Sequence, residues 1–399
     1  MKDDTPHSFL SLRDIPRTRA VIVLHYYTTG PGQELHDWLR QRGAEESVLI
    51  EHPFIFSARA WARVDVCRKD SGCAERKLPR RRWPMAIRYA LDFLRTIRLV
   101  LSLKGTYDLY VGNGCFDTVP GLILRRLGKV RTVVLYTIDY APNAAGSRFH
   151  AWLYRRLDRH CCYRVNAIWD LSHRMMPARH GDGHRPERCA PSVWVPHGNH
   201  ARVLARTLPA SADPCRIAFM GHIQEKSGLQ LVFEALAEAR GEFPSLRLDV
   251  VGDGPYRPNL QQLAQRLGLT DCVRFHGYVE RHEDLERMLS ACGIGLALYN
   301  PKTSDYSYLA DPGKPKVYMA CGLPIVISDV PEVAALIEER GAGKRAAYDK
   351  AALLDALRAI MRDHKQYRAR ALKLADEFDW DAVFARAWEQ TPGRRVHGV

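Results

Sequence analysis

The sequence lacks the marks of a disulfide-rich scaffold and of an exported protein. Ten cysteines are scattered over 399 residues without a Cys-x-x-Cys motif, and the adjacent Cys161 and Cys162 cannot easily pair with each other. Residues 1–19 are polar and mixed in charge, so we expect no export signal. The expected location is a reducing cytosol, with the cysteines mostly serving as small core residues.

Length and composition are sufficient for two domains of ordinary size. The 399 residues are 46% hydrophobic, which is enough to fill two cores. The net charge of +14 is unevenly spread, because residues 1–200 hold 32 lysines and arginines against 19 acidic residues, whereas 201–399 hold 27 against 26. We therefore expect the two halves to meet different partners.

Short apolar runs alternate with helical patterns in the first half. The run 20–27 (AVIVLHYY) ends at the glycine loop TTGPG, and a helical pattern follows until Gly43. A further helix is predicted at 119–128. Further buried strands are predicted at 47–54, 107–114 and 131–140. This order predicts a parallel sheet covered on both faces.

The second half shows the same alternation more clearly. Strands are predicted at 215–223, 246–254, 272–279, 294–300 and 323–328. Helices are predicted at 228–241, 258–269, 282–292, 330–341 and in a long tail from Lys350. Short connections between strands and helices are typical of a doubly wound sheet. Three prolines without periodicity place a linker near 197–214, so we expect domains at 1–200 and 201–375.

An anion-binding pattern follows the first predicted strand of the second half. The strand ends near Gly221, and Lys226 stands in the loop before the helix that begins at Gly228. Backbone N–H groups at a helix start favour an anion, and the lysine adds a full charge, so a diphosphate is the expected ligand. An ordinary solvated loop lysine is the alternative.

A dinucleotide is not expected at the next strand end. The G-x-G of Gly252 and Gly254 is a weak signal alone, and Arg257 stands where the third glycine of the NAD-binding fingerprint would fall.

The order of five segments resembles a known family. GHIQEKSG, VVGDGPY, LTDCVRFHGYV, LALYN and ACGLPIVIS resemble the donor half of the retaining, family 4-like (group 1) glycosyltransferases, over residues 215–345. The resemblance implies the GT-B fold, in which an acceptor-binding and a donor-binding Rossmann-like domain face a cleft. The tail FDWDAVFARAWE resembles the closing helix of that family, so 376–399 is expected to cross back to the first domain.

The stretch YLADPGKPKVYMACGLP departs from the family pattern. The resemblance implies a ribose-binding glutamate at the position of Val317, and valine accepts no hydrogen bond. The residues expected to contact the donor are instead Asp311, Gly313, Lys314 and Lys316. The glycine would permit close backbone approach, the lysines would meet the diphosphate, and the aspartate would bind sugar or ribose hydroxyls. Asp305 is the competing carboxylate, and a surface loop with an aspartate helix cap is the alternative.

Catalysis in this family requires that the leaving diphosphate is stabilised. Lys226, with Lys314 or Lys316, would supply the positive charge, so we expect neither a metal nor another cofactor. The resemblance adds Gly221, His222 and Gly254 as donor-binding residues. The Asp-Trp-Asp at 379–381 is more typical of a helix cap than of a cation site.

The first half offers fewer candidates. The loop HYYTTGPG resembles the glycine loop of the family beside the donor phosphate, which makes Gly30 and Gly32 candidates, although an ordinary strand-helix turn explains both. Asp139 follows a buried strand and is the candidate acceptor-side catalytic residue. His197 and Asn199 resemble a family corner and are expected to be hinge contacts rather than catalysts.

The segment 76–105 concentrates the positive charge. It carries nine lysines and arginines against Asp92, which is too much charge to span a bilayer. The apolar positions Ile87, Ala90, Leu91, Leu94, Ile97 and Leu101 form one helical face beside Trp83. Such a face suits an anionic membrane surface and a lipid-linked or saccharide acceptor, whereas the ordinary alternative is the core side of a helix.

The resemblance therefore implies a metal-independent, hexosyltransferase-like enzyme that moves a sugar from a nucleotide-diphosphate sugar to an acceptor hydroxyl with retention. It is expected in the cytoplasm, at the inner face of the membrane. The alternatives are another GT-B enzyme such as a nucleotide-sugar epimerase, and a non-catalytic sugar-nucleotide or nucleic-acid binder. The pI of about 9.4 is the reason to consider a nucleic-acid binder. The basic cluster has few aromatic residues between its lysines and arginines, however, so nucleic acid is not an expected partner.

Overall fold

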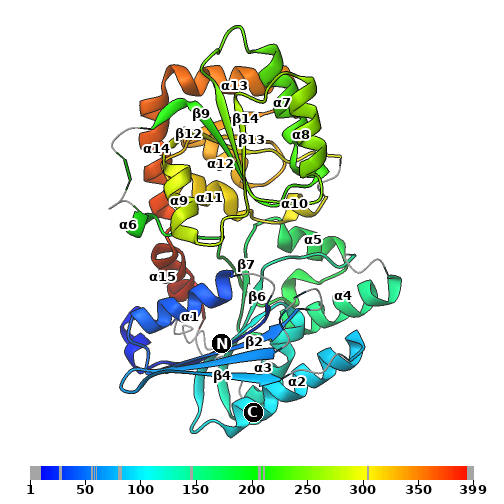
Figure 1. The fold of residues 1–399 in the computed structure, drawn as a ribbon. Coiled ribbons are helices and arrows are strands. Elements are labelled where there is room, and N and C mark those ends of the chain that lie inside the picture. The colour runs from blue at the N-terminus through cyan, green and yellow to red at the C-terminus, as the bar shows by residue number, and fades with distance from the viewer. Residues whose placement is uncertain are drawn as a thin grey trace. The chain divides into compact units, whose positions relative to one another are not determined.

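The computed structural model describes residues 10–26, 29–54, 57, 59, 61–79, 83–143, 147–204, 208–209, 212–302 and 305–392. The chain divides into two compact units, which are Met1–Pro196 together with Val383–Val399, and His197–Ala382. Each unit contains one sheet with helices packed against it (Figure 1). The predicted α/β class with two Rossmann-like domains is confirmed.

Within the described residues, the sheet of the first unit has the strand order β4-β3-β2-β1-β5-β6-β7-β8. The strands are β1 (Arg19–Tyr26), β2 (Glu46–Pro53), β3 (Trp61–Arg68), β4 (Gly72–Pro79), β5 (Tyr107–Asn113), β6 (Val130–Thr137), β7 (Ala167–Asp170) and β8 (Ser192–Trp194). From β2 to β8 neighbouring strands run parallel, as predicted.

The strands β3 and β4 correct the prediction of a wholly parallel sheet. They form an antiparallel hairpin at the sheet edge, and the sequence analysis missed it. The reason is that most of β4 is exposed and its sequence GCAERKLP shows no alternation of apolar and polar residues. The basic segment that was predicted as one unit therefore begins in β4, and its residues Arg80–Arg82 lie outside the described residues.

The hairpin also corrects the expectation for the cysteines. Cys67 of β3 and Cys73 of β4 are paired in the ladder and joined by a disulfide. In a reducing cytosol the pair would be two thiols, but the backbone hydrogen bonds of the ladder would still hold the hairpin. Cys161 and Cys162 are free and buried, as expected.

The helices of the first unit cover both faces of its sheet. They are η1 (Leu12–Arg17), α1 (Pro31–Gln41), α2 (Met85–Ser102), α3 (Cys115–Arg126), α4 (Arg148–Cys162), α5 (Met175–Gly181) and η2 (Pro186–Arg188), with α15 (Trp380–Gln390) contributing from Val383 onward. Because alternate residues of a strand point to opposite faces, Val21 and Val23 share one core with Val100 of α2 and Leu122 of α3. Leu24, on the opposite face, lies against α1.

The C-terminal segment completes the core of the first unit. The rings of Phe384 and Trp388 lie 5.7 and 5.8 Å from the ring of Trp38 in α1. The indole N–H of Trp388 donates to the backbone oxygen of Ser11 at 3.1 Å. The segment is therefore an integral layer of this unit rather than a loose tail.

The helix α2 has its apolar row on the outside. The exposed fractions of Ile87, Leu91, Leu94 and Leu101 are 44 to 47%, whereas Asp92 and Thr96 are 2 and 1% exposed. Most of the apolar face predicted from the sequence is therefore not the core side of the helix, although Ile97, a member of that face, packs against the core. In the described part of the chain, no helix combines the length and apolar character needed to cross a bilayer.

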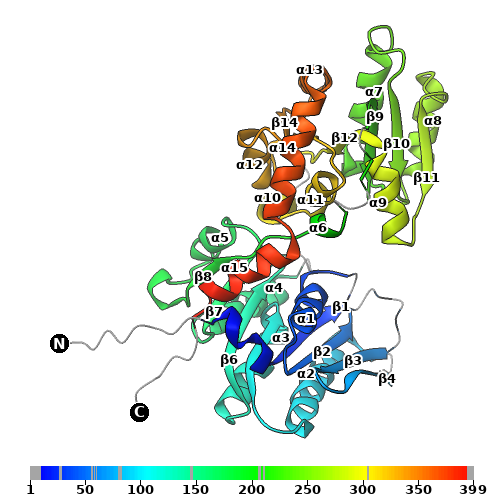
Figure 2. The ribbon, with the colours of Figure 1, turned by 90° about the vertical axis from the view of Figure 1, so that its left-hand side faces the viewer.

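The second unit contains an entirely parallel sheet in the described residues, with the order β11-β10-β9-β12-β13-β14. Its strands are β9 (Asp213–Met220), β10 (Arg247–Val251), β11 (Val273–Gly277), β12 (Cys292–Ala297), β13 (Ile325–Ser328) and β14 (Gly343–Ala346). Its helices are α6 (Ala201–Leu204), η3 (Glu225–Ser227), α7 (Leu229–Glu238), α8 (Arg257–Arg266), α9 (His282–Ser290), α10 (Asp305–Leu309), α11 (Gly313–Ala320), α12 (Val333–Glu339), α13 (Lys350–Arg362) and α14 (His364–Glu377). Figure 2 shows α7 and α8 beside β9, β10 and β11.

Substitution of Trp388 tests whether the C-terminal segment is part of the first core. Trp388→Ala removes a side chain that is 1% exposed, so we expect the free energy of unfolding to fall by about 3 to 5 kcal/mol. Urea unfolding measures the change, and Glu389→Ala, at the next and exposed position, is the control. Equal stability of the two variants would contradict the packing described above.

Candidate functional site

The order of strands in the second sheet creates a ligand-binding edge. If the strands are numbered along the chain with β9 as the first, their order in the sheet is 3-2-1-4-5-6, which is the order of the doubly wound nucleotide-binding fold. The chain therefore reverses its direction of winding between β9 and β12. Ligands bind in such sheets at the carboxyl ends of the strands beside this reversal. The loops that follow β9 and β12 are therefore the expected site.

Glycines allow two of these loops to pack backbone against backbone. The N–H of Gly221 donates to Val251 O at 2.9 Å, and the N–H of Ile223 donates to Asp253 O at 2.9 Å. A Cβ at Gly254 would lie 2.3 Å from Ile223 O, and one at Gly252 would lie 2.0 Å from Gly221 O. Gly254, a predicted donor contact, is therefore required by the neighbouring loop of the protein itself.

Lys314 lies against the loop after β9. A Cβ at Gly221, whose φ is +128°, would lie 2.5 Å from Lys314 Cε, so only glycine leaves room for this lysine. The ammonium lies 4.8 Å from the ring centre of Phe219, and within the described residues Lys314 makes no ion pair. Burial lowers the pKa of Lys314 to about 8. A half-buried cation without a carboxylate is suited to receive an anionic ligand.

Lys316 does not have the role predicted for it, whereas the predicted binding of sugar or ribose hydroxyls by Asp311 stays a prediction. Lys316 is fully buried, and its ammonium pairs with Asp311 Oδ1 and bonds the carbonyl of Pro312. The other oxygen of Asp311 accepts the backbone N–H of His197 at 2.7 Å. The pair is internal, because the lysine has no exposed surface for a phosphate. The predicted contact of Lys316 with the diphosphate is wrong, and Asp311 positions the loop.

Gly313 approaches a side chain of the protein rather than open space. A Cβ there would lie 2.9 Å from Cε1 of His197. The side-chain amide of Asn199 donates to the backbone oxygens of Lys316 and Ala375, at 3.1 and 3.2 Å. His197 and Asn199 are thus structural contacts inside the second unit.

Lys226 lines a pocket of about 500 Å³ in the second unit. The lysine is exposed in η3, after β9, and Asn300, which follows β12, also lines the pocket. The pocket therefore lies beside the reversal of winding described above. His222 is exposed, and its Nδ1 lies 3.0 Å from Asp253 O.

Tyr299 is a candidate that sequence reasoning missed. It lies two residues after β12 ends at Ala297, and among the described residues its buried hydroxyl has no hydrogen-bond partner. Burial and the nearby charge of Asp311 raise the pKa of this hydroxyl, which stays protonated and can donate. The motif LALYN could have indicated this residue, since it places an aromatic side chain with a hydroxyl at a strand end.

Val317 lies half-buried on α11, and the side chain of Asp305 is not described.

The candidates of the first unit lie at strand ends too. Gly30 precedes α1, and its N–H donates to Gln33 Oε1 at 3.0 Å. A Cβ at Gly32 would lie 2.6 Å from Asn113 Nδ2, so this glycine lets α1 approach the sheet. Asp139 is exposed two residues after β6 ends at Thr137. The catalytic role of Asp139 stays a prediction.

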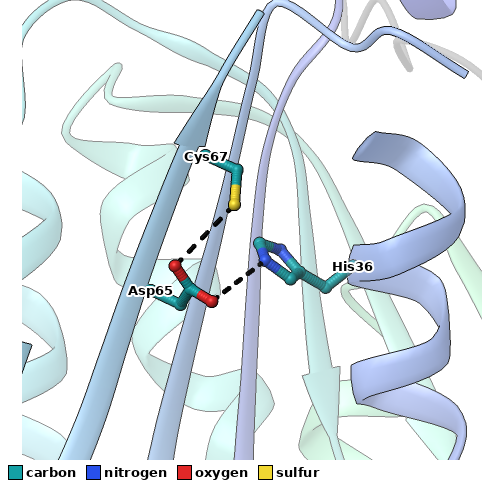
Figure 3. Close-up of side chains that lie close together, drawn as sticks. All are labelled: His36, Asp65 and Cys67. Atoms are coloured by element: carbon teal, nitrogen blue, oxygen red, sulfur yellow. Dashed lines mark hydrogen bonds and ion pairs between the residues drawn. The ribbon is translucent and has the colours of Figure 1, made fainter. Parts of the chain in front are cut away.

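One group of potential metal ligands is occupied by other interactions. His36, Asp65 and Cys67 lie close together in the first unit, with His36 Nε2 3.8 Å from Asp65 Oδ2 (Figure 3). Arg63 Nη2 lies 3.1 Å from the same carboxylate, and the sulfur of Cys67 belongs to the disulfide. The carboxylate of Asp65 is therefore already paired with Arg63, and Cys67 offers no thiolate while the disulfide is intact.

A second group is held together by an arginine. Asp158, Cys162 and His184 are buried, and Asp158 Oδ2 lies 2.8 Å from Nε of the fully buried Arg179. The guanidinium neutralises the carboxylate, which makes the group a structural ion pair. The expectation of a metal-independent reaction stays a prediction.

The fold defines a class of protein. The crystal structure of HepE from Anabaena in complex with UDP and glucose aligns over 93% of this chain and 98% of that chain, with a TM-score of 0.62 and 16% sequence identity. A likeness at this identity shows the fold alone, and it confirms the predicted GT-B fold.

Sequence comparisons identify relatives of this chain. Residues 214–363 match the family model described as glycosyl transferases group 1, which confirms the predicted resemblance. The chain is 31% identical to alpha-D-kanosaminyltransferase of Streptomyces kanamyceticus over 248 residues, which cover 58% of this chain and 61% of the relative. It is 25% identical to the putative colanic acid biosynthesis glycosyltransferase WcaL of Salmonella typhimurium over 235 residues, covering 57% and 55%. The chain thus spans little more than half the length of these two relatives.

Removal of the Lys314 charge is expected to stabilise the fold. Its folded pKa of about 8 lies below the ordinary 10.5, so the protonated lysine destabilises the protein below pH 8, and this penalty disappears as the pH rises toward 10.5. Lys314→Met should raise the free energy of unfolding by about 1 to 3 kcal/mol at pH 7 and by less at pH 10. Urea unfolding at both pH values measures the gain, with the exposed Lys365→Met as control. A gain that does not change with pH would show that charge burial is not its cause.

Proposed function

We propose that this chain is a glycosyltransferase that moves a sugar from a nucleotide-diphosphate sugar to a hydroxyl of an acceptor, with retention. The match of residues 214–363 to the group 1 glycosyltransferases supports the reaction class. The fold is shared with a protein whose crystal structure holds UDP and glucose, which supports a nucleotide-sugar donor. The names of the two relatives support a saccharide precursor as acceptor, and we extend the proposal to a lipid-linked precursor.

The observation that carries the proposal is the half-buried ammonium of Lys314. It lies at the carboxyl edge of the sheet, beside the loop after β9, and no ion pair neutralises it within the described residues. A diphosphate would supply the missing negative charge in a partly dry environment, where charge-assisted hydrogen bonds are strong. Lys226, in the same loop after β9, would meet the ligand from the pocket.

These lysines would also promote the reaction. As the bond between sugar and phosphate breaks, negative charge grows on the leaving diphosphate, and fixed cations stabilise that transition state more than the ground state. Tyr299 adds a neutral donor at the end of β12. We propose a metal-independent, hexosyl-type transfer on this basis, with Asp139 orienting or deprotonating the acceptor hydroxyl.

A titration tests the donor half. We expect one of UDP, GDP, ADP and dTDP to bind selectively in calorimetry, and Lys226→Ala and Lys314→Met each to weaken binding about 10- to 100-fold, the effect of losing one charged hydrogen bond. Lys365→Ala, an exposed lysine on α14, should bind as the wild type does. Binding of NAD alone, or of no diphosphate, would remove the basis of the proposal. Binding without turnover of the sugar nucleotide would instead favour a non-catalytic binder, as Val317 suggests.

We also propose that α2 carries the chain to the cytoplasmic face of an anionic membrane. Ile87, Leu91, Leu94 and Leu101 form an exposed apolar row at helical spacing. Arg98, between them, is exposed, and Trp83 just before the helix is 46% exposed. An apolar row with flanking cations is typical of a helix that lies in the headgroup region of a bilayer.

A vesicle experiment tests this surface. Leu91→Glu places a charge in the row, and we expect co-sedimentation with phosphatidylglycerol vesicles to fall at least fivefold, since it removes apolar contact and adds repulsion. Leu127→Glu changes a leucine of the same unit that is 60% exposed and lies outside the row, so it should sediment as the wild type does. Equal loss in both variants, or no binding of the wild type, would argue against the α2 surface.

A further inference from the structure

The first unit contains a pocket of about 260 Å³ that none of the proposed steps uses. It lies between α2 and α3, at the carboxyl ends of β1 and β2, and four titratable side chains from four elements line it. They are His25 of β1, His52 of β2, Asp92 of α2 and Asp117 of α3. Aromatic walls are provided by Tyr89, Phe93 and Phe116. The pocket is too small for a drug-sized ligand and suits a single ring.

Two nitrogens in this pocket are buried and have no hydrogen-bond partner among the residues that the structure describes. His25 Nδ1 bonds Asp117 Oδ1 at 2.9 Å, while its Nε2 lies 3.8 Å from Asp92 Oδ2. His52 Nε2 bonds the hydroxyl of Thr96 at 2.7 Å, while its Nδ1 lies 3.4 Å from Asp92 Oδ1 without hydrogen-bond geometry. His52 is 1% exposed. Buried unsatisfied groups are rare because each costs about 1 to 3 kcal/mol, so a ligand that satisfies them would be favoured.

The charges of the pocket cancel. Burial lowers the pKa of His25, but Asp117 and Asp92 outweigh this effect and raise it to about 9, so its imidazole is charged at neutral pH. Arg95 Nη1 lies 3.9 Å from Asp92 Oδ1, and burial lowers the pKa of His52. Two cations therefore balance two carboxylates. A phosphate or carboxylate ligand would bury an uncompensated charge beside Asp92 and Asp117, which is unfavourable.

We propose that this pocket binds an uncharged sugar ring of the acceptor, with its hydroxyls on the His25, His52 and Asp92 cluster and its apolar face on Phe116. A sugar ring combines several hydroxyl donors and acceptors with polarised C–H groups that pack on aromatic faces, and the pocket offers both kinds of partner. The proposal rests on the proposed glycosyltransferase function. Ile87, Leu91, Leu94 and Leu101 of the exposed apolar row do not line the pocket, so the pocket ligand is distinct from any lipid chain on that row.

Saturation-transfer NMR on the full chain tests the pocket. The probes are the methyl α-D-glycosides of glucose, mannose and galactose, with glucuronate and glucose 6-phosphate as anionic counterparts. We expect at least one neutral glycoside to receive saturation and neither anion to do so. Phe116→Ala removes the stacking wall, and Ala90→Trp fills the exposed edge of the pocket, so each should reduce the signal at least fivefold. Phe149→Ala changes an aromatic of the same unit that is 64% exposed and outside the pocket, and should have no effect.

Nucleoside diphosphate titration of the same variants separates this proposal from the proposed function. The substituted residues lie in the first unit, so donor binding should be unchanged in all of them. Intact donor binding with no neutral glycoside bound, or with binding insensitive to both pocket variants, would overturn the sugar pocket alone. Binding of the anionic sugars as strongly as the neutral ones would overturn the charge argument and the proposal with it. Absence of donor binding in the wild type would count against the proposed function.

Discussion

The buried ion pair between Lys316 and Asp311 decides which cation of the second unit can meet a ligand. Both residues of the pair make further hydrogen bonds inside the second unit. The carboxylate of Asp311 accepts the backbone N–H of His197, and the backbone oxygen of Lys316 accepts the side-chain amide of Asn199. A buried pair with satisfied hydrogen bonds holds its loop in one arrangement. Lys314, two residues earlier, is then left at the loop edge beside Gly221, and it makes no ion pair with any residue that the structure describes. The arrangement therefore separates a structural lysine from one that is available to an anion.

The strand ends of the two units are built in different ways. In the second unit, glycines let the loops after β9 and β10 touch through their backbones, which leaves the lysines as the ligand-binding groups. In the first unit, side chains of β1, β2, α2 and α3 form a polar cluster instead. That cluster also explains why α2 turns its apolar row outward, since Asp92 and Thr96 are held inside by the two histidines.

Sequence reasoning succeeded where a residue pattern depends on neighbours along the chain. The apolar runs of β1, β9 and β10, the helix start after Lys226 and the order of the group 1 segments follow from local spacing. It failed for the hairpin of β3 and β4, because the edge strand β4 buries few side chains and its sequence does not alternate between apolar and polar residues. It also failed for Tyr299, whose unsatisfied hydroxyl depends on what surrounds it in space.

The sequence alone determined the α/β class, the doubly wound second half, the resemblance to the group 1 glycosyltransferases and the set of lysines around the opening of α11. Periodicity and motif order are properties of the chain itself, so no coordinates were required. The tertiary structure decided that Lys316 is internal and Lys314 is not, that the apolar row of α2 faces outward, and that four titratable residues distant in sequence share one pocket. Burial and charge pairing arise from contacts between distant segments, and the order of residues along the chain does not specify them.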